Sequence, residues 1–162
     1  MQYTLIRNIF SRKNRFEVSD IHGQPAYQVA KTQSGLMKSI FTLTGEKSQI
    51  ETTIERHYKS FKTIYSIFQD GRKIAALRRK LKLFRSYFTL EFVDGKTYLI
   101  KCDAWRKKYT FYEEEEVVAK LERKTMKMQR TYELTCLNMN HHEVLLASVV
   151  GLDQIFDQDS SG

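Results

Sequence analysis

Residues 144–156 read VLLASVVGLDQIF, and wound as a helix this stretch is apolar on almost every side. Asn140, followed three residues later by Glu143, is typical of a capping box where a helix begins. An apolar helix must be buried, and this one is shorter than the roughly 20 residues that span a bilayer. We therefore expect a helix at about 141–157 enclosed by protein, with Gly151 allowing close backbone approach, followed by a polar tail at 158–162.

The chain before this helix predicts a series of antiparallel β-hairpins. Turn signals at 20–23, 44–46, 70–71 and 94–95 separate stretches rich in Tyr, Phe, Ile, Val and Thr. The Asp-Gly pairs at 70–71 and 94–95 are typical of two-residue type I′ loops. Residues 48–62 have both helical and strand-like spacing, and their β-branched residues favour a mostly extended segment.

An internal repeat supports the hairpin interpretation. The segment YSIFQDGRKIAALRRK at 65–80 aligns without gaps to YTFYEEEEVVAKLERK at 109–124. Each copy predicts a strand, a turn and a second strand, and repeated hairpins in a short chain favour a closed antiparallel sheet. Combined with the buried helix, the pattern predicts one β-barrel domain over residues 1–157, wrapped around its own C-terminal helix.

Composition limits the classes of function that fit. The chain has 162 residues, with 27 Lys and Arg against 19 Asp and Glu, which gives a formal charge of +8. Its two cysteines supply neither a disulfide framework nor a zinc site. The first residues lack the apolar block of a signal peptide, and the expected location is the cytoplasm, with peripheral contact at a membrane as an option.

Four segments of the chain are distinctive: IRNIFSRKNRFEVSDIHGQPAYQVA at 6–30, IAALRRK at 74–80, VVAKLERK at 117–124 and HHEVLLASVVGLDQIFD at 141–157. They resemble those of the LURP-one-related family, which shares the tubby C-terminal-like fold with tubby proteins and phospholipid scramblases. The resemblance implies a twelve-stranded antiparallel closed barrel threaded by a hydrophobic C-terminal helix. Residues 33–62 match the repeated unit poorly, and Glu113 to Glu116 stand where a glycine turn is expected.

The same resemblance implies a connection with lipids. Similarity to tubby proteins implies that basic side chains on the barrel wall bind phosphoinositide headgroups. Similarity to scramblases implies a lipid partner, but this chain has no counterpart of their cysteine-rich palmitoylation segment or terminal membrane helix. We therefore do not expect lipid scrambling.

Basic residues cluster in three places and are the candidate ligand-binding residues, because guanidinium and ammonium groups suit phosphate. Basic side chains at strand ends also commonly solvate the rim of a barrel, and the row Ala75, Leu77, Arg79 places its Arg near such an end. The solvated rim is the simpler interpretation. The candidates are Arg78, Arg79, Lys80, Lys82 and Arg85; Arg106, Lys107 and Lys108; and Arg123 and Lys124, with Lys127 and Arg130 nearby.

Nothing in the sequence predicts an enzyme, a metal site or a cofactor. The adjacent His141 and His142 lack a third ligand, and no Gly-x-Ser-x-Gly elbow is present. Aromatics such as Trp105 and Tyr109 lie among the basic clusters, as in a nucleic-acid stacking platform, but core packing explains them more simply. We expect a non-enzymatic module that binds an anionic ligand such as a phospholipid headgroup. A protein-interaction scaffold is the alternative, and nonspecific nucleic-acid binding is the third reading.

Overall fold

The computed structural model describes residues 1–9, 15–36, 38–59, 62–83, 85–126, 128–138 and 140–161. Within these ranges, side chains are described except at 58, 59, 62, 63, 82, 85 and 86. The strands are β1 (Gln2–Asn8), β2 (Arg15–Asp20), β3 (Pro25–Ser34), β4 (Lys38–Gly45), β5 (Thr52–Lys59), β6 (Lys62–Gln69), β7 (Arg72–Lys82), β8 (Arg85–Phe92), β9 (Thr97–Cys102), β10 (Lys108–Glu113), β11 (Glu116–Met126) and β12 (Gln129–Cys136), followed by the helix α1 (His142–Ser160).

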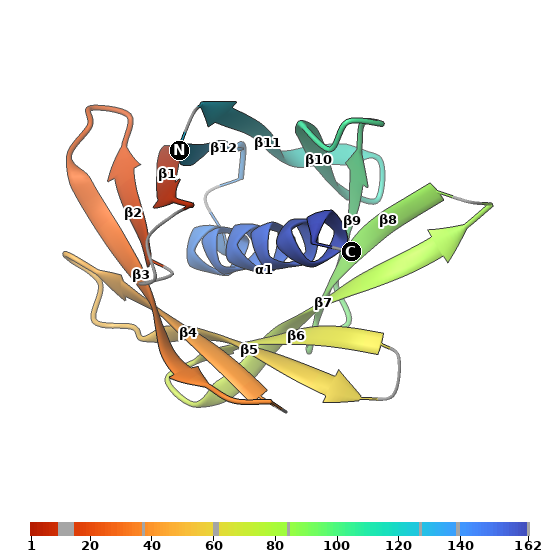
Figure 1. The fold of residues 1–162 in the computed structure, drawn as a ribbon, viewed down its shortest axis with the longest axis horizontal. Helices are drawn as coiled ribbons and strands as arrows, with labels where there is room; N and C mark the ends of the chain where they lie inside the picture. Colours follow the sequence, from red (N-terminus) through yellow and green to blue (C-terminus); the bar gives the residue numbers. More distant parts are fainter. Residues whose placement is uncertain are drawn as a thin grey trace.

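These strands form a closed antiparallel barrel around α1, as predicted (Figure 1). Every strand pairs with its neighbours in the sequence, and β1 closes the barrel by pairing with β12 from Gln2 opposite Thr135 to Asn8 opposite Gln129. Closure satisfies the backbone donors and acceptors that an edge strand would leave exposed. Each of these twelve strands is therefore paired with a neighbour on both sides.

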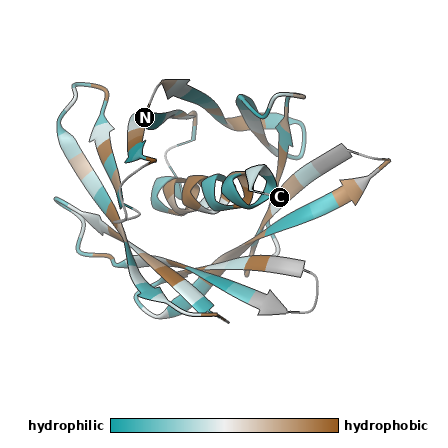
Figure 2. Ribbon diagram, in the orientation of Figure 1, coloured by the Kyte–Doolittle hydropathy of each residue, from teal (hydrophilic) through white to brown (hydrophobic). Residues whose placement is uncertain are grey.

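The core lies between the inner face of the barrel and the helix. Alternate residues of each strand point inward, and hydrophobic and hydrophilic bands alternate along several strands (Figure 2). On the helix, Val144, Leu146 and Val149 have 0% exposure, and Leu77 and Ile100 on the strands have the same value. Burying each such side chain contributes about 1.5–3 kcal/mol, so the packing of the helix against the inner face of the barrel stabilises the fold.

The two ends of the helix differ from the sequence prediction. His141 precedes the helix at φ 62° without a side-chain cap, so the predicted Asn140/Glu143 capping box is wrong. The surrounding strands supply other donors: the Glu143 carboxylate accepts hydrogen bonds from the Tyr27 hydroxyl at 3.0 Å and the Thr52 hydroxyl at 3.4 Å. The helix also continues to Ser160, so residues 158–160 belong to its last turn rather than to a polar tail.

The internal repeat corresponds to a repeated structure. The hairpin β6–β7 has a register shift between Ile67 and Phe68, and β10–β11 has one between Phe111 and Tyr112, at the aligned position. The turns also correspond, because Asp70 has φ 48° and the aligned Glu114 has φ 54°. Glu114 and Glu115 thus form the turn in which a glycine was expected.

Two other local predictions have different outcomes. The ambiguous segment 48–62 contains β5, which confirms the extended interpretation, although residues 60 and 61 lie outside the described part. The Asp-Gly pair at 70–71 forms a two-residue loop, but that at 94–95 lies in a four-residue connection between Phe92 and Thr97. There the Phe92 amide donates to the Lys96 carbonyl at 2.8 Å and the Gly95 amide donates to the Phe92 carbonyl at 3.1 Å, so residues 93–95 form a three-residue loop with Gly95 at φ 95°.

Gly151 gives a test of the helix packing. A Cβ at this position would lie 2.7 Å from Leu77 Cδ2 and 3.1 Å from Ile54 Cδ1. We expect Gly151→Val to lower the free energy of unfolding by about 1–3 kcal/mol, because the core is overpacked there. Urea denaturation measures the change. In a Leu77→Ala background the same substitution should cost less, and an equal cost in both backgrounds would contradict the proposed contact.

Candidate functional site

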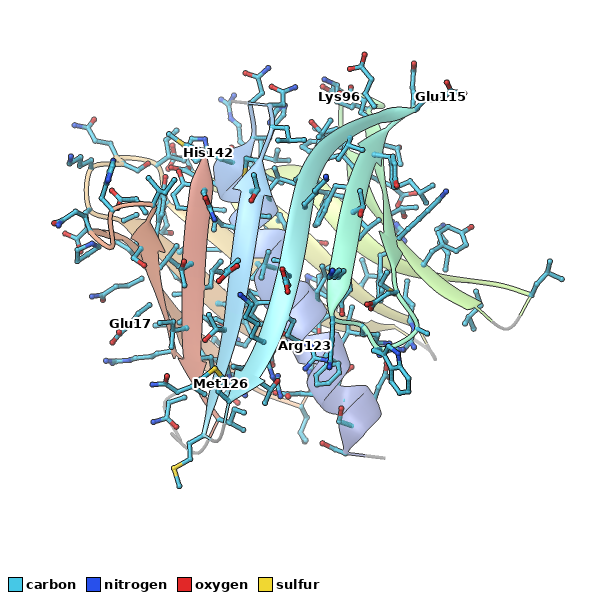
Figure 3. The ribbon with its side chains drawn as sticks, turned by 90° about the horizontal axis from the view of Figure 1, so that it is seen from above. Glu17, Lys96, Glu115, Arg123, Met126 and His142 are labelled. Carbon is cyan, nitrogen blue, oxygen red and sulfur yellow. The ribbon has the colours of Figure 1, made fainter. Side chains whose placement is uncertain are left out.

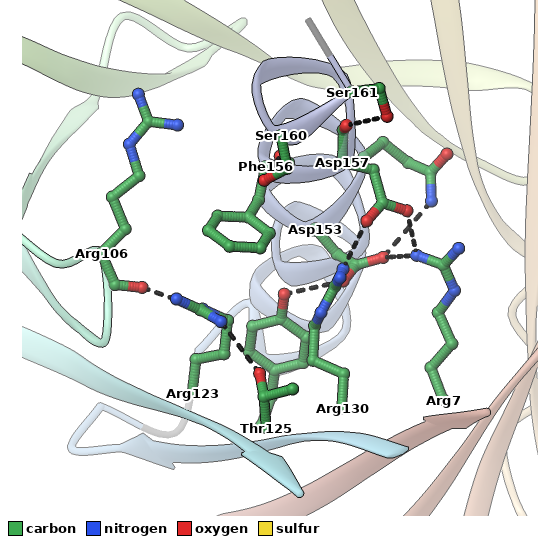
Figure 4. A network of polar contacts seen from close by, with 12 residues as sticks. Arg7, Arg106, Arg123, Thr125, Arg130, Asp153, Phe156, Asp157, Ser160 and Ser161 are labelled. Carbon is green, nitrogen blue, oxygen red and sulfur yellow. Dashed lines mark hydrogen bonds and ion pairs between the residues drawn. The ribbon is translucent and has the colours of Figure 1, made fainter. Parts of the chain in front are cut away.

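Cationic side chains gather at the end of the barrel where the helix ends. Inward-facing positions on six strands supply one cation each, and the β9–β10 connection supplies another. Arg7, Arg106, Arg123 and Arg130 surround the last two turns of α1 (Figure 4), which carry Asp153, Asp157 and Asp159. We call this region the basic end; its cations are Arg7 (β1), Lys31 (β3), Arg56 (β5), Arg79 (β7), Arg106 (β9–β10), Arg123 (β11) and Arg130 (β12).

The innermost part of the basic end is a buried ion-pair network around Asp153. The Asp153 side chain has 0% exposure and is contacted by the guanidinium groups of Arg7 and Arg130, the latter at 2.6 Å. Its carboxylate also accepts hydrogen bonds from the Tyr132 hydroxyl at 2.7 Å and from the side-chain amide of Gln154 at 3.3 Å. A carboxylate is tolerated inside the barrel only because its charge and its oxygen lone pairs are both satisfied.

Asp157 lies one helical turn further toward solvent and joins the same two arginines. Its carboxylate oxygens lie 2.6 Å from Arg7 and 2.7 Å from Arg130. Burial alone raises the pKa of this carboxyl, but the hydrogen bonds and charges of Arg130 and Arg7 outweigh it and hold the pKa below its ordinary value. Both carboxylates are thus bound by the protein's own arginines.

The outer part of the basic end uses the repeated strands. Arg79 and Arg123 occupy aligned positions of the repeat, and both reach the end of the helix. Arg79 pairs with Asp159 at 2.9 Å, and Arg106 contacts the other oxygen of the same carboxylate. Arg123 instead lies 3.9 Å above the ring of Phe156 and donates to the Arg106 carbonyl at 3.0 Å.

Two further cations extend the basic end on the side of β3 and β5. The Lys31 ammonium lies 5.7 Å from the centre of the Phe41 ring. Burial lowers the pKa of Lys31, and the positive charges of Arg56 and Arg7 lower it further. The seven named cations outnumber four carboxylates, the three on the helix and Asp103 in the β9–β10 connection, so these residues together carry an excess of positive charge.

The structure brings together some of the candidate residues and separates others. Arg79, Arg106 and Arg123 converge on the helix end, which confirms that the Arg of the Ala75–Leu77–Arg79 row lies at a barrel end. Arg78 and Lys124 instead point away from the core and pair with Glu91 at 2.5 Å and Glu133 at 3.0 Å. Lys80 is half-buried, and Lys107 and Lys108 are exposed. The side chains of Lys82 and Arg85, and all of Lys127, lie outside the described part.

Sequence reasoning missed the residues that organise the network. Arg7 and Asp153 were not identified, although each breaks an apolar pattern: Tyr3 and Leu5 alternate into the core ahead of Arg7, and Asp153 interrupts an apolar helix. A buried charge in an otherwise apolar row predicts a buried partner. This signal could have identified both residues without showing that they meet.

The opposite end of the barrel holds a smaller polar cluster. The Tyr27 hydroxyl donates to Glu143 and lies 3.1 Å from the His142 ring nitrogen. Burial and the charge of Glu143 raise the pKa of Tyr27 well above its ordinary value, so this phenol stays protonated and acts as a donor. Within the described residues, no group of three His, Cys, Asp or Glu side chains could hold a metal ion. In the same part of the chain, no helix has the length and apolarity needed to cross a bilayer.

A comparison with known protein families matches residues 1–153 to the family described as LURP-one-related. No curated protein matches the chain, and no solved structure does. The expected kinship with tubby proteins and phospholipid scramblases therefore stays a prediction.

The buried network predicts unequal effects for two matched substitutions on the same helix. Asp153→Asn leaves two buried guanidinium groups without the full charge that compensates them, and we expect it to lower the free energy of unfolding by about 3–5 kcal/mol. Asp159→Asn removes a carboxylate whose side chain is 31% exposed, and we expect a loss of no more than about 1 kcal/mol. Chemical denaturation of both variants compares them, and similar losses would contradict the central role of Asp153.

Asp157 predicts how stability depends on pH. Because its pKa is lower in the folded chain than the ordinary 3.8, the stabilisation it provides is complete above that value and is lost as the pH falls through the folded pKa. We expect the free energy of unfolding to decrease below about pH 4 and the decrease to be smaller in Asp157→Asn. Thermal unfolding across this acidic range measures both slopes, and identical slopes would show that the folded pKa is not depressed.

Proposed function

The chain belongs to the LURP-one-related family, and from this premise and the charge of the basic end we propose that it is a non-catalytic module that binds anionic phosphorylated ligands, with phospholipid headgroups as the ligand class. The observation that carries the proposal is the excess of cations over carboxylates around the end of α1. Arg79 and Arg106 share the single carboxylate of Asp159, while Lys31 and Arg123 add positive charge beside them.

The chemistry of the basic end suits phosphate. Arginine presents planar donor groups that match phosphate oxygens in pairs, and the guanidinium groups here are held in place by carboxylates and by the Phe156 ring. Side chains that are already positioned lose little conformational entropy when a ligand binds. Each basic residue close to an anionic surface contributes about 1 kcal/mol, so several acting together give measurable affinity.

The same geometry supports a binding role rather than catalysis. Asp153 and Asp157 are each held by two arginines, so these carboxylates serve as ion-pair partners and are poor candidates for a general base. Burial and the charge of Asp153 raise the pKa of the neighbouring Tyr132 well above its ordinary value, so this phenol stays protonated as well.

Co-sedimentation with vesicles tests the proposal. We expect binding to vesicles of phosphatidylcholine with phosphatidylserine or a phosphoinositide, weak binding to phosphatidylcholine alone, and a decrease with added salt. Lys80→Glu combined with Lys107→Glu should weaken binding by at least about tenfold, because both residues lie on the hairpins of the basic end.

A matched control separates the basic end from the net charge of the protein. Lys47→Glu combined with Lys73→Glu makes the same change in charge at the opposite end of the barrel, where we expect little effect. Equal losses in the two double variants would contradict a site at the basic end. Tighter, salt-dependent binding to single-stranded nucleic acid than to vesicles would contradict the lipid class.

A further inference from the structure

Exposed apolar side chains project from the hairpins of the basic end. Leu81 and Leu83 are 77% and 84% exposed at the tip of β7–β8, and Trp105 is 77% exposed in the β9–β10 connection. Met126, at the end of β11, is 73% exposed. The β7–β8 hairpin extends beyond the end of the helix (Figure 1), so the two leucines at its tip project away from the barrel wall.

The backbone of the loop that carries Trp105 is held in place by hydrogen bonds. Arg123 donates to the Trp105 carbonyl at 3.3 Å and the Arg106 carbonyl at 3.0 Å, and an Asp103 oxygen accepts from the Lys107 amide at 2.7 Å. The loop is thus fixed while its indole faces solvent. Leu83 adopts φ 48°, a conformation that leucine seldom takes, in a turn that leaves its side chain exposed.

The two ends of the barrel differ in charge. The turns at the opposite end are rich in carboxylates, and this end also holds His142, Glu115 and Lys96, whereas Met126 lies at the other end (Figure 3). The barrel therefore has a basic end and an acidic end, and an anionic surface would attract the former and repel the latter. The acidic residues are Asp20, Glu46, Glu51, Asp70, Asp94 and Glu113 to Glu116, beside the cations Lys47, Arg72, Lys73 and Lys96.

We propose that the basic end docks on the surface of an anionic bilayer and that Trp105, Leu81 and Leu83 insert into its interfacial layer. This inference rests on the proposed function and adds the source of the headgroups, the orientation of the barrel and the residues that enter the membrane. Tryptophan and leucine beside Lys and Arg are the combination that binds membrane interfaces, where the apolar groups enter and the cations contact headgroups.

The arrangement of the apolar groups favours a bilayer over a folded protein partner. They come from two hairpins, with both leucines on one and Trp105 on the other, and each is next in the sequence to a cation: Lys80 precedes Leu81, Lys82 precedes Leu83, and Arg106 follows Trp105. A protein interface has an apolar centre from which charges are depleted. A fluid lipid surface can accept separate apolar tips with charged groups between them.

Trp105 is the sole tryptophan in the chain, so its fluorescence reports on the proposed insertion directly. We expect its emission to shift to shorter wavelength on addition of vesicles of phosphatidylcholine with phosphatidylserine, and to be quenched when the lipids carry brominated acyl chains. Vesicles of phosphatidylcholine alone should produce neither change.

The outcomes separate this inference from the proposed function. If the protein co-sediments with anionic vesicles while its tryptophan emission stays unchanged, headgroup binding stands and insertion is overturned. If it binds a soluble inositol phosphate but no vesicles, the site recognises phosphate and the bilayer is the wrong source. If it binds neither, both proposals fail.

A pair of double variants tests the leucines independently of fluorescence. Leu81→Ser with Leu83→Ser should weaken binding to anionic vesicles by about tenfold, because two apolar side chains no longer enter the lipid, and should leave inositol phosphate binding unchanged. Ile21→Ser with Val93→Ser is the control, since these residues are 67% and 66% exposed at the acidic end. Equal affinities for vesicles in the two double variants would overturn the proposed orientation.

Discussion

The constraint on which the structure depends is that a helix apolar on all sides must be shielded from water everywhere along its length. Twelve strands closed into a barrel provide that enclosure, and they do so with side chains that alternate between the core and solvent. Enclosure leaves polar chemistry to the two ends of the barrel, where the helix enters and leaves the core. The candidate site lies at an end for this reason.

The cost of burying charge explains how the basic end is built. Asp153 has no exposure, so it requires both Arg7 and Arg130, and these arginines in turn hold Asp157 one turn further along. The same strands that enclose the apolar part of the helix supply these cations at their ends. Part of the positive charge therefore stabilises the helix, and the remainder lies beside it in excess of the helix carboxylates.

The difference in charge between the two ends gives the barrel a direction. Carboxylates concentrate in the turns near the start of the helix, and cations concentrate near its end, where the negative end of the helix dipole also favours them. Among the described residues, exposed apolar side chains occur at both ends, and at the basic end Leu81 and Trp105 are next in the sequence to the cations Lys80 and Arg106. Charge, more than apolarity, thus distinguishes the end that suits an anionic surface.

Local patterns in the sequence determined the helix, the hairpins and the barrel, because an unbroken apolar stretch and period-two alternation each require one kind of burial. The repeat even placed Arg79 and Arg123 at equivalent barrel ends. The sequence could not show that Arg7 and Asp153, nearly the whole chain apart, form one ion-pair network, nor that Glu143 binds strand hydroxyls instead of capping its helix. Those contacts follow from the register of β1 against β12 and from the depth of the helix in the barrel. Only the tertiary structure sets these, because they depend on how distant segments pack rather than on the properties of any one segment.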